Sequence, residues 1–63
     1  ISHPTLIIWG EQDRVFPPAV GAELHQRIRG SALVTIPQAG HMPQWERPEL
    51  VNRSLIEYIH SLP

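Results

Sequence analysis

The sequence contains no cysteine, no lysine and no long hydrophobic run. Without cysteine, neither disulfides nor thiolate metal sites can form. The five basic residues are all arginines, and they alternate with scattered acidic residues, so no basic stripe exists to follow a phosphate backbone. The longest apolar stretch, from Leu6 to Trp9, is far shorter than the roughly 20 residues of a membrane span. We therefore expect neither a nucleic-acid partner nor a membrane.

The chain is also short. Its 63 residues form at most one small domain, and a domain of that size buries only about 60% of the surface that its unfolded chain exposes. Small free-standing domains usually add disulfides, a structural metal or oligomerisation. The sequence begins at Ile1 and has neither the charged n-region nor the apolar h-region of a signal peptide. We expect a cytoplasmic location.

The first half of the sequence predicts a strand followed by a helix. The apolar run from Thr5 to Trp9 is typical of a strand that is buried on both faces. A charged loop follows. An apolar residue at every fourth position then predicts a short amphipathic helix from Pro18 to about Ile28, with proline in a first turn that does not need its N–H. We expect this helix to stop near Gly30.

The second half repeats the pattern. A run rich in β-branched residues, from Ala32 to Ile36, predicts the second strand. A loop from Pro37 to Arg47 follows. The last helix is expected from about Pro48 to Ser61, with one apolar stripe along its length. The residues of that stripe are Leu50, Val51, Leu55, Tyr58, Ile59 and Leu62.

The order strand, helix, strand, helix predicts an α/β fold in which two parallel strands are joined by a right-handed crossover. Strands that are apolar on both faces need helices on both sides and further strands at their edges. The sequence supplies only two strands and two helices. We therefore expect residues 1–63 to be incomplete as a domain and to form part of a larger one.

Two residues with catalytic chemistry lie in the loops that follow the strands. Asp13 lies in the first loop and His41 in the second, and the loops after parallel strands emerge at the same edge of a sheet. Neighbouring strands are about 4.8 Å apart, so the two side chains can meet. A carboxylate bonded to one imidazole nitrogen leaves the other to take a proton from a nucleophile or from water. The placement predicts an Asp13–His41 pair.

The other candidates for this chemistry are weaker. Glu11 lies on the same loop as Asp13 and is the competing acid, although it is nearer the strand end. The remaining histidines, His3, His25 and His60, show no His-x-x-x-His or comparable ligand spacing. We therefore expect neither a metal nor a cofactor.

Both loop segments resemble those of the α/β-hydrolase superfamily. The stretch from Pro4 to Asp13 resembles its acid-bearing strand and loop, and Gly40-His41, followed by Glu46 and an amphipathic helix, is similar to its histidine loop and final helix. The acid precedes the histidine, as in the superfamily. The resemblance implies that residues 1–63 are the C-terminal β-α-β-α fragment of one α/β-hydrolase domain. It makes Asp13 the triad acid, His41 the general base, and Glu46 a residue that orders the loop or the start of the last helix.

The third member of such a triad is missing. The sequence has no Gly-x-Ser-x-Gly nucleophile elbow and no oxyanion-hole segment, both of which the superfamily places upstream. Three of its four serines, Ser2, Ser31 and Ser54, stand before a strand, before the next strand and inside a helix, and the fourth, Ser61, ends the last predicted helix. None of them is the nucleophile. Serine, aspartate and cysteine all remain open for the missing group. We expect the 63 residues to be inactive alone.

The segment from Gly40 to Arg47 looks especially like the meta-cleavage-product hydrolases, which split carbon–carbon bonds. In that group a tryptophan shortly after the histidine lies near the substrate, and this sequence has Trp45. Esterases and lactonases of the superfamily show similar loops. The implied substrate is a small ester, lactone or diketone-like molecule, and Trp45, Met42 and Phe16 are the candidate substrate contacts, although each equally suits a packing role.

Two other functions remain open. One is a non-catalytic protein of the same fold that serves as a binding module, which an upstream elbow without a nucleophile would favour. The other is a small interaction protein whose apolar strands pair with the sheet of a partner. The presence of both the acid and the histidine favours the enzyme over the binding module, and sedimentation or gel filtration of the isolated chain tests the interaction protein.

Overall fold

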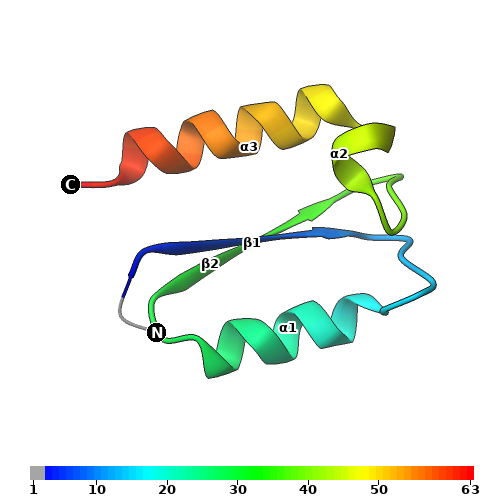
Figure 1. Cartoon of the computed structure of the whole chain (residues 1–63), viewed down its shortest axis with the longest axis horizontal. Coiled ribbons are helices and arrows are strands. Elements are labelled where there is room, and N and C mark those ends of the chain that lie inside the picture. Colours follow the sequence, from blue (N-terminus) through cyan, green and yellow to red (C-terminus); the bar gives the residue numbers. More distant parts are fainter. Residues whose placement is uncertain (1–2) are drawn as a thin grey trace.

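The protein is described here by a computed structural model covering residues 3–63. Its centre is a parallel pair of strands, β1 (Thr5–Gly10) and β2 (Ser31–Ile36), in which Thr5 lies opposite Ser31 and Gly10 lies opposite Ile36. Helix α1 (Pro18–Arg27) connects them and packs on both strands, while α3 (Pro48–Ser61) packs against β2. The two helices lie on opposite sides of the strands (Figure 1). This confirms the predicted α/β fold with a parallel crossover.

The predicted elements are confirmed to within one residue at each end. The first strand extends to Gly10, and the second begins at Ser31. Helix α1 ends at Arg27, and Ile28 is its C-terminal cap. Gly30 then turns the chain toward β2 with a φ of 79°, a left-handed conformation that glycine adopts without steric cost. Along residues 3–63, no helix has the length and apolar character needed to cross a membrane.

The predicted loop from Pro37 to Arg47 contains a fifth element, which corrects the sequence prediction. A single helical turn, α2 (Pro43–Glu46), lies between β2 and α3. The N–H groups of Trp45 and Glu46 both donate to the carbonyl of Met42, at 3.0 and 3.1 Å. So short a turn carries no hydrophobic period, and only its proline at the first position signals it in the sequence.

A small core lies between β2, the loop after it, and α3. Ile36, Ala39 and Val51 are buried there, with Ile8, Val34 and Leu50 partly buried around them. Ala39 is fully buried although it belongs to the loop that carries His41. The core therefore anchors that loop directly.

The strands and α3 are only partly buried. Along β1 and β2 only Ile7, Gly10 and Ile36 are buried, which agrees with the expectation that strands of this kind need more neighbouring elements than this chain supplies. The α3 stripe is buried at Val51 and half-buried at Tyr58, whereas Leu55, Ile59 and Leu62 are exposed. The physical reason is that one helix on each face covers only part of a two-stranded sheet.

Candidate active site

The two loops that follow the strands are joined at their bases. The N–H of Glu11 donates to the carbonyl of Ile36 at 2.9 Å, and the N–H of Gln12 donates to the carbonyl of Ala39 at 2.8 Å. Gly10 makes this approach possible, because a side chain there would collide with the backbone carbonyl oxygens of Ala39 and Gly40. The end of β1 and the histidine loop are thus fixed against each other.

Asp13 is the most constrained side chain of the site. Its Oδ1 accepts hydrogen bonds from the N–H groups of Val15 and Phe16, both at 2.9 Å. Its Oδ2 lies 3.1 Å from Nδ1 of His41. The residue is only 8% exposed. Both carboxylate oxygens are therefore occupied, and one of them faces the histidine.

The environment of Asp13 favours its ionised form. Loss of hydration raises the pKa of the carboxyl group, but the hydrogen bonds from the Phe16 N–H, from His41 and from the Val15 N–H, together with attraction to His41, outweigh it. The net result is a pKa below the ordinary value of 3.8. At neutral pH, Asp13 is a carboxylate that can stabilise a positive imidazole.

The lowered pKa of Asp13 predicts a loss of stability in acid. The pKa returns to about its ordinary value in the unfolded chain, so the stabilisation is complete above pH 3.8 and disappears as the pH falls through the lower, folded-state value. We expect the difference in urea unfolding midpoint between the wild type and Asp13→Asn to be constant at higher pH and to shrink below pH 3.8. An equal difference at pH 6 and pH 2.5 would contradict this assignment.

His41 projects from the histidine loop with 45% of its side chain exposed. The bond to Asp13 engages Nδ1, so Nε2 is the nitrogen available for proton transfer. The ring of Phe16 lies against the imidazole, with centroids 5.8 Å apart and planes tilted by 46°. A small cavity of about 100 Å³ opens beside the pair and is lined by Ile8, Trp9, Gly10, Asp13, His41 and Pro43.

Two interactions of the site were not predicted from the sequence in this form. The indole Nε1 of Trp9 donates to the carbonyl of Phe16 at 2.9 Å and ties the acid loop to β1. The carboxylate of Glu46 accepts the N–H of Gly40 at 3.0 Å and that of Met42 at 3.2 Å. Of the two roles expected for Glu46, these bonds favour the ordering of the loop over that of the last helix start, and their placement around His41 was not foreseen.

Comparison with known proteins decides the family. A family model described as alpha/beta hydrolase fold matches residues 1–48, which is most of the chain. The chain belongs to this family. The resemblance seen in the sequence is therefore confirmed.

Related proteins agree with this membership. An uncharacterized hydrolase, YugF, from Bacillus subtilis is 39% identical over 94% of this alpha/beta-hydrolase chain and 22% of its own length. A 2-hydroxy-6-oxononadienedioate/2-hydroxy-6-oxononatrienedioate hydrolase from Paraburkholderia xenovorans is 36% identical over 94% of the chain and 20% of its own length. The chain thus spans about a fifth of these relatives.

A solved structure gives the same result for the fold. A thermophilic esterase from Thermogutta terrifontis, with malate bound, superposes with a TM-score of 0.90 and 37% sequence identity. The match covers 94% of this chain and 22% of the esterase. Two parallel strands and their helices thus correspond to one continuous part of a larger α/β-hydrolase fold.

The structure separates the other predicted site residues. Phe16 contacts the His41 ring, as described above. Met42 directly follows His41 and is exposed, whereas Trp45 projects from α2 with 80% of its surface exposed. Glu11, the competing acid, joins β2 through its backbone N–H, and it is Asp13 that lies beside the imidazole.

A contact between a serine and a histidine lies at the opposite end of the strands from the Asp13–His41 pair. His25 Nδ1 and Ser31 Oγ are 2.8 Å apart, and the same hydroxyl donates to the His25 carbonyl at 3.2 Å. Ser31 begins β2, whereas His41 follows its end, so this contact closes the turn after α1 and does not belong to the site. Ser54 lies within α3, and Ser2 lies outside the described residues.

Proposed function

We propose that residues 1–63 are the C-terminal part of a single α/β-hydrolase domain in which Asp13 and His41 are the acid and the general base of the catalytic triad. The observation that supports this proposal most is the 3.1 Å contact between Asp13 Oδ2 and His41 Nδ1 at the edge where both loops emerge. The second support is the pair of backbone bonds that fixes Asp13 Oδ1.

The geometry suits a simple proton-transfer role. Nε2 of His41 takes a proton from a nucleophile or from water, and the imidazole becomes positively charged. The Asp13 carboxylate fixes the tautomer through Nδ1 and stabilises that charge. Nε2 then returns the proton to the leaving group. The lowered pKa of Asp13 serves this role, because the carboxylate stays ionised while His41 gains and loses its proton.

The proposed substrate is a small molecule with an ester, a lactone or a carbon–carbon bond next to a carbonyl group. The relatives named as an esterase and as a dioate hydrolase support this range. The proposed substrate contacts are Phe16, Met42 and Trp45. Phe16 borders the imidazole of His41. Met42 and Trp45 follow His41 in the sequence and have exposed side chains.

A substrate panel tests the proposal. The complete protein is expected to hydrolyse at least one of 4-nitrophenyl butyrate, a γ-lactone and a vinylogous 1,5-diketone acid, as followed by product formation. The isolated chain of residues 1–63 is expected to hydrolyse none of them above the buffer rate, because it contains no nucleophile elbow. If the complete protein hydrolysed none of the three, the non-catalytic binding module would be the better reading.

A further inference from the structure

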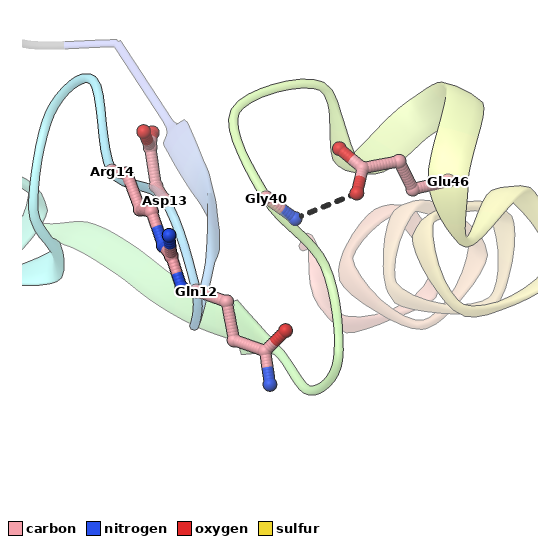
Figure 2. A pocket seen from close by; sticks show the side chains of 5 residues that line it. All are labelled: Gln12, Asp13, Arg14, Gly40 and Glu46. Carbon is pink, nitrogen blue, oxygen red and sulfur yellow. Dashed lines mark hydrogen bonds between the residues drawn. The ribbon is translucent and has the colours of Figure 1, made fainter.

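Glu46 holds the backbone on both sides of His41. Its Oε1 accepts the N–H of Gly40 at 3.0 Å, and its Oε2 accepts the N–H of Met42 at 3.2 Å. Figure 2 shows the first of these bonds, with the carboxylate of Glu46 directed across at the backbone of Gly40. One carboxylate therefore binds the residue before the histidine and the residue after it. We refer to this arrangement as the Glu46 clamp.

The exposure of His41 makes its backbone important. Because 45% of its side chain is exposed, the imidazole has limited packing around it, and its direction depends on Asp13, Phe16 and the course of its own main chain. Ala39, two residues earlier, is fully buried and bonded through its carbonyl to Gln12. The Glu46 clamp fixes the next part of the same loop.

The clamp stands on a rigid support. Glu46 is the last residue of α2, and its own N–H donates to the carbonyl of Met42 at 3.1 Å. The next residue, Arg47, is at once the C-terminal cap of α2 and the N-terminal cap of α3, and its carbonyl accepts the N–H of Val51 at 3.1 Å. Val51 belongs to the core. The position of α3 is thus transmitted to the histidine loop.

The hydrogen bonds of the carboxylate favour a positioning role for Glu46. Each of its oxygens accepts a backbone N–H, and the bonded partner of the imidazole is Asp13. A glutamine in its place offers only one acceptor oxygen and turns an NH₂ group toward the second N–H. The two backbone bonds therefore require a carboxylate, although a side chain of the same shape fits the space.

We propose that Glu46 is a positioning residue for His41, whose carboxylate keeps Nε2 aimed at the reacting atom by fixing Gly40 and Met42. This inference rests on the proposed function of His41 as general base. Misplacement of a catalytic group by about 1 Å lowers turnover by up to about 10²-fold. Loss of the clamp is therefore expected to act on kcat, because the two bonds of Glu46 go to the backbone on either side of His41.

The test uses the complete protein with 4-nitrophenyl butyrate as the probe. Glu46→Gln is expected to lower kcat, normalised to the folded fraction, by about 10-fold to 100-fold with KM within about twofold. Glu49→Gln is the matched control: it removes the same charge three residues away in the first turn of α3, and we expect wild-type kinetics. Amide NMR is the second readout. In Glu46→Gln, but not in Glu49→Gln, we expect the N–H signals of Gly40 and Met42 to move upfield and to lose protection from hydrogen exchange.

Each outcome decides the inference. A fall in normalised kcat together with the change in the two amide signals supports it. The inference is overturned if Glu46→Gln has the wild-type kcat, or if its loss of activity matches its unfolded fraction. If His41→Ala is inactive in the same assay, the proposed function still stands. Full activity in His41→Ala removes the proposed function and this inference with it.

Discussion

Replacing His41 with alanine in the complete protein is expected to lower kcat by about 10⁴-fold or more. The substitution removes the nitrogen that accepts the proton, and Asp13, which lies beside Nδ1, is then left with no imidazole to orient. Some stability should be lost as well, because the buried Oδ2 of Asp13 loses its hydrogen-bond partner. The measurement is kcat on whichever panel substrate the wild type turns over, with thermal unfolding recorded in parallel.

Asp13→Asn provides the second arm of this experiment. The asparagine oxygen can still accept the N–H groups of Val15 and Phe16, but its NH₂ group faces Nδ1 and favours the wrong imidazole tautomer. Since the pair acts as a unit, the double variant should be no slower than His41→Ala alone. His60→Ala, at the end of α3, is the matched control and should retain full activity. More than a tenth of the wild-type rate in His41→Ala would contradict the triad assignment.

Replacing Gly10 with alanine is expected to destabilise the protein by about 3 kcal/mol and to reduce activity further than the lost stability explains. The added Cβ would overlap the carbonyl oxygens of Ala39 and Gly40, which are backbone atoms with no freedom to rotate away. Relief requires the end of β1 and the histidine loop to separate, and Asp13 moves with β1. Urea unfolding and kcat measured on the folded fraction test the two parts.

Gly30→Ala separates this effect from the general cost of losing a glycine. A Cβ at Gly30 meets nothing within 4 Å, but the φ of 79° is unfavourable for alanine. We expect Gly30→Ala to lower the free energy of unfolding by about 1 kcal/mol. The kcat of the folded fraction should be unchanged. Equal losses of stability and activity in Gly10→Ala and Gly30→Ala would argue against a special role for the close approach of the histidine loop to Gly10.

The regular elements were predictable from the sequence because their signals are local. An apolar run between Pro4 and Gly10 reads as a strand, and a spacing of four in the next segment reads as a helix. The contact between Asp13 and His41 was predictable for a different reason. Parallel strands bring their following loops to one edge, so topology alone places the two residues together.

The conformation of the histidine loop was not predictable. Gln38 has a φ of 56°, a left-handed backbone that glutamine does not favour by itself. The helical turn α2 and the Glu46 clamp depend on backbone groups that meet only after the loop has folded onto the core. A pattern of residue types contains no record of such contacts.

The burial of individual residues along α3 was likewise not predictable. A spacing of three and four identifies the apolar stripe, but it does not say what covers each of its members. Val51 meets the core beside Ile36, whereas Ile59 lies beyond the reach of β2 and is exposed. Periodicity thus predicts which side of a helix is apolar, and burial depends on the neighbours.

The parallel register of β1 and β2 also links the assembly of the site to the folding of the sheet. Asp13 and His41 are 28 residues apart, and Thr5 pairs with Ser31 across the α1 crossover, so both contacts need the same long loop to close. Closing that loop costs chain entropy before any strand bond repays it. The contact between Asp13 and His41 therefore shares its entropic cost with the pairing of the strands.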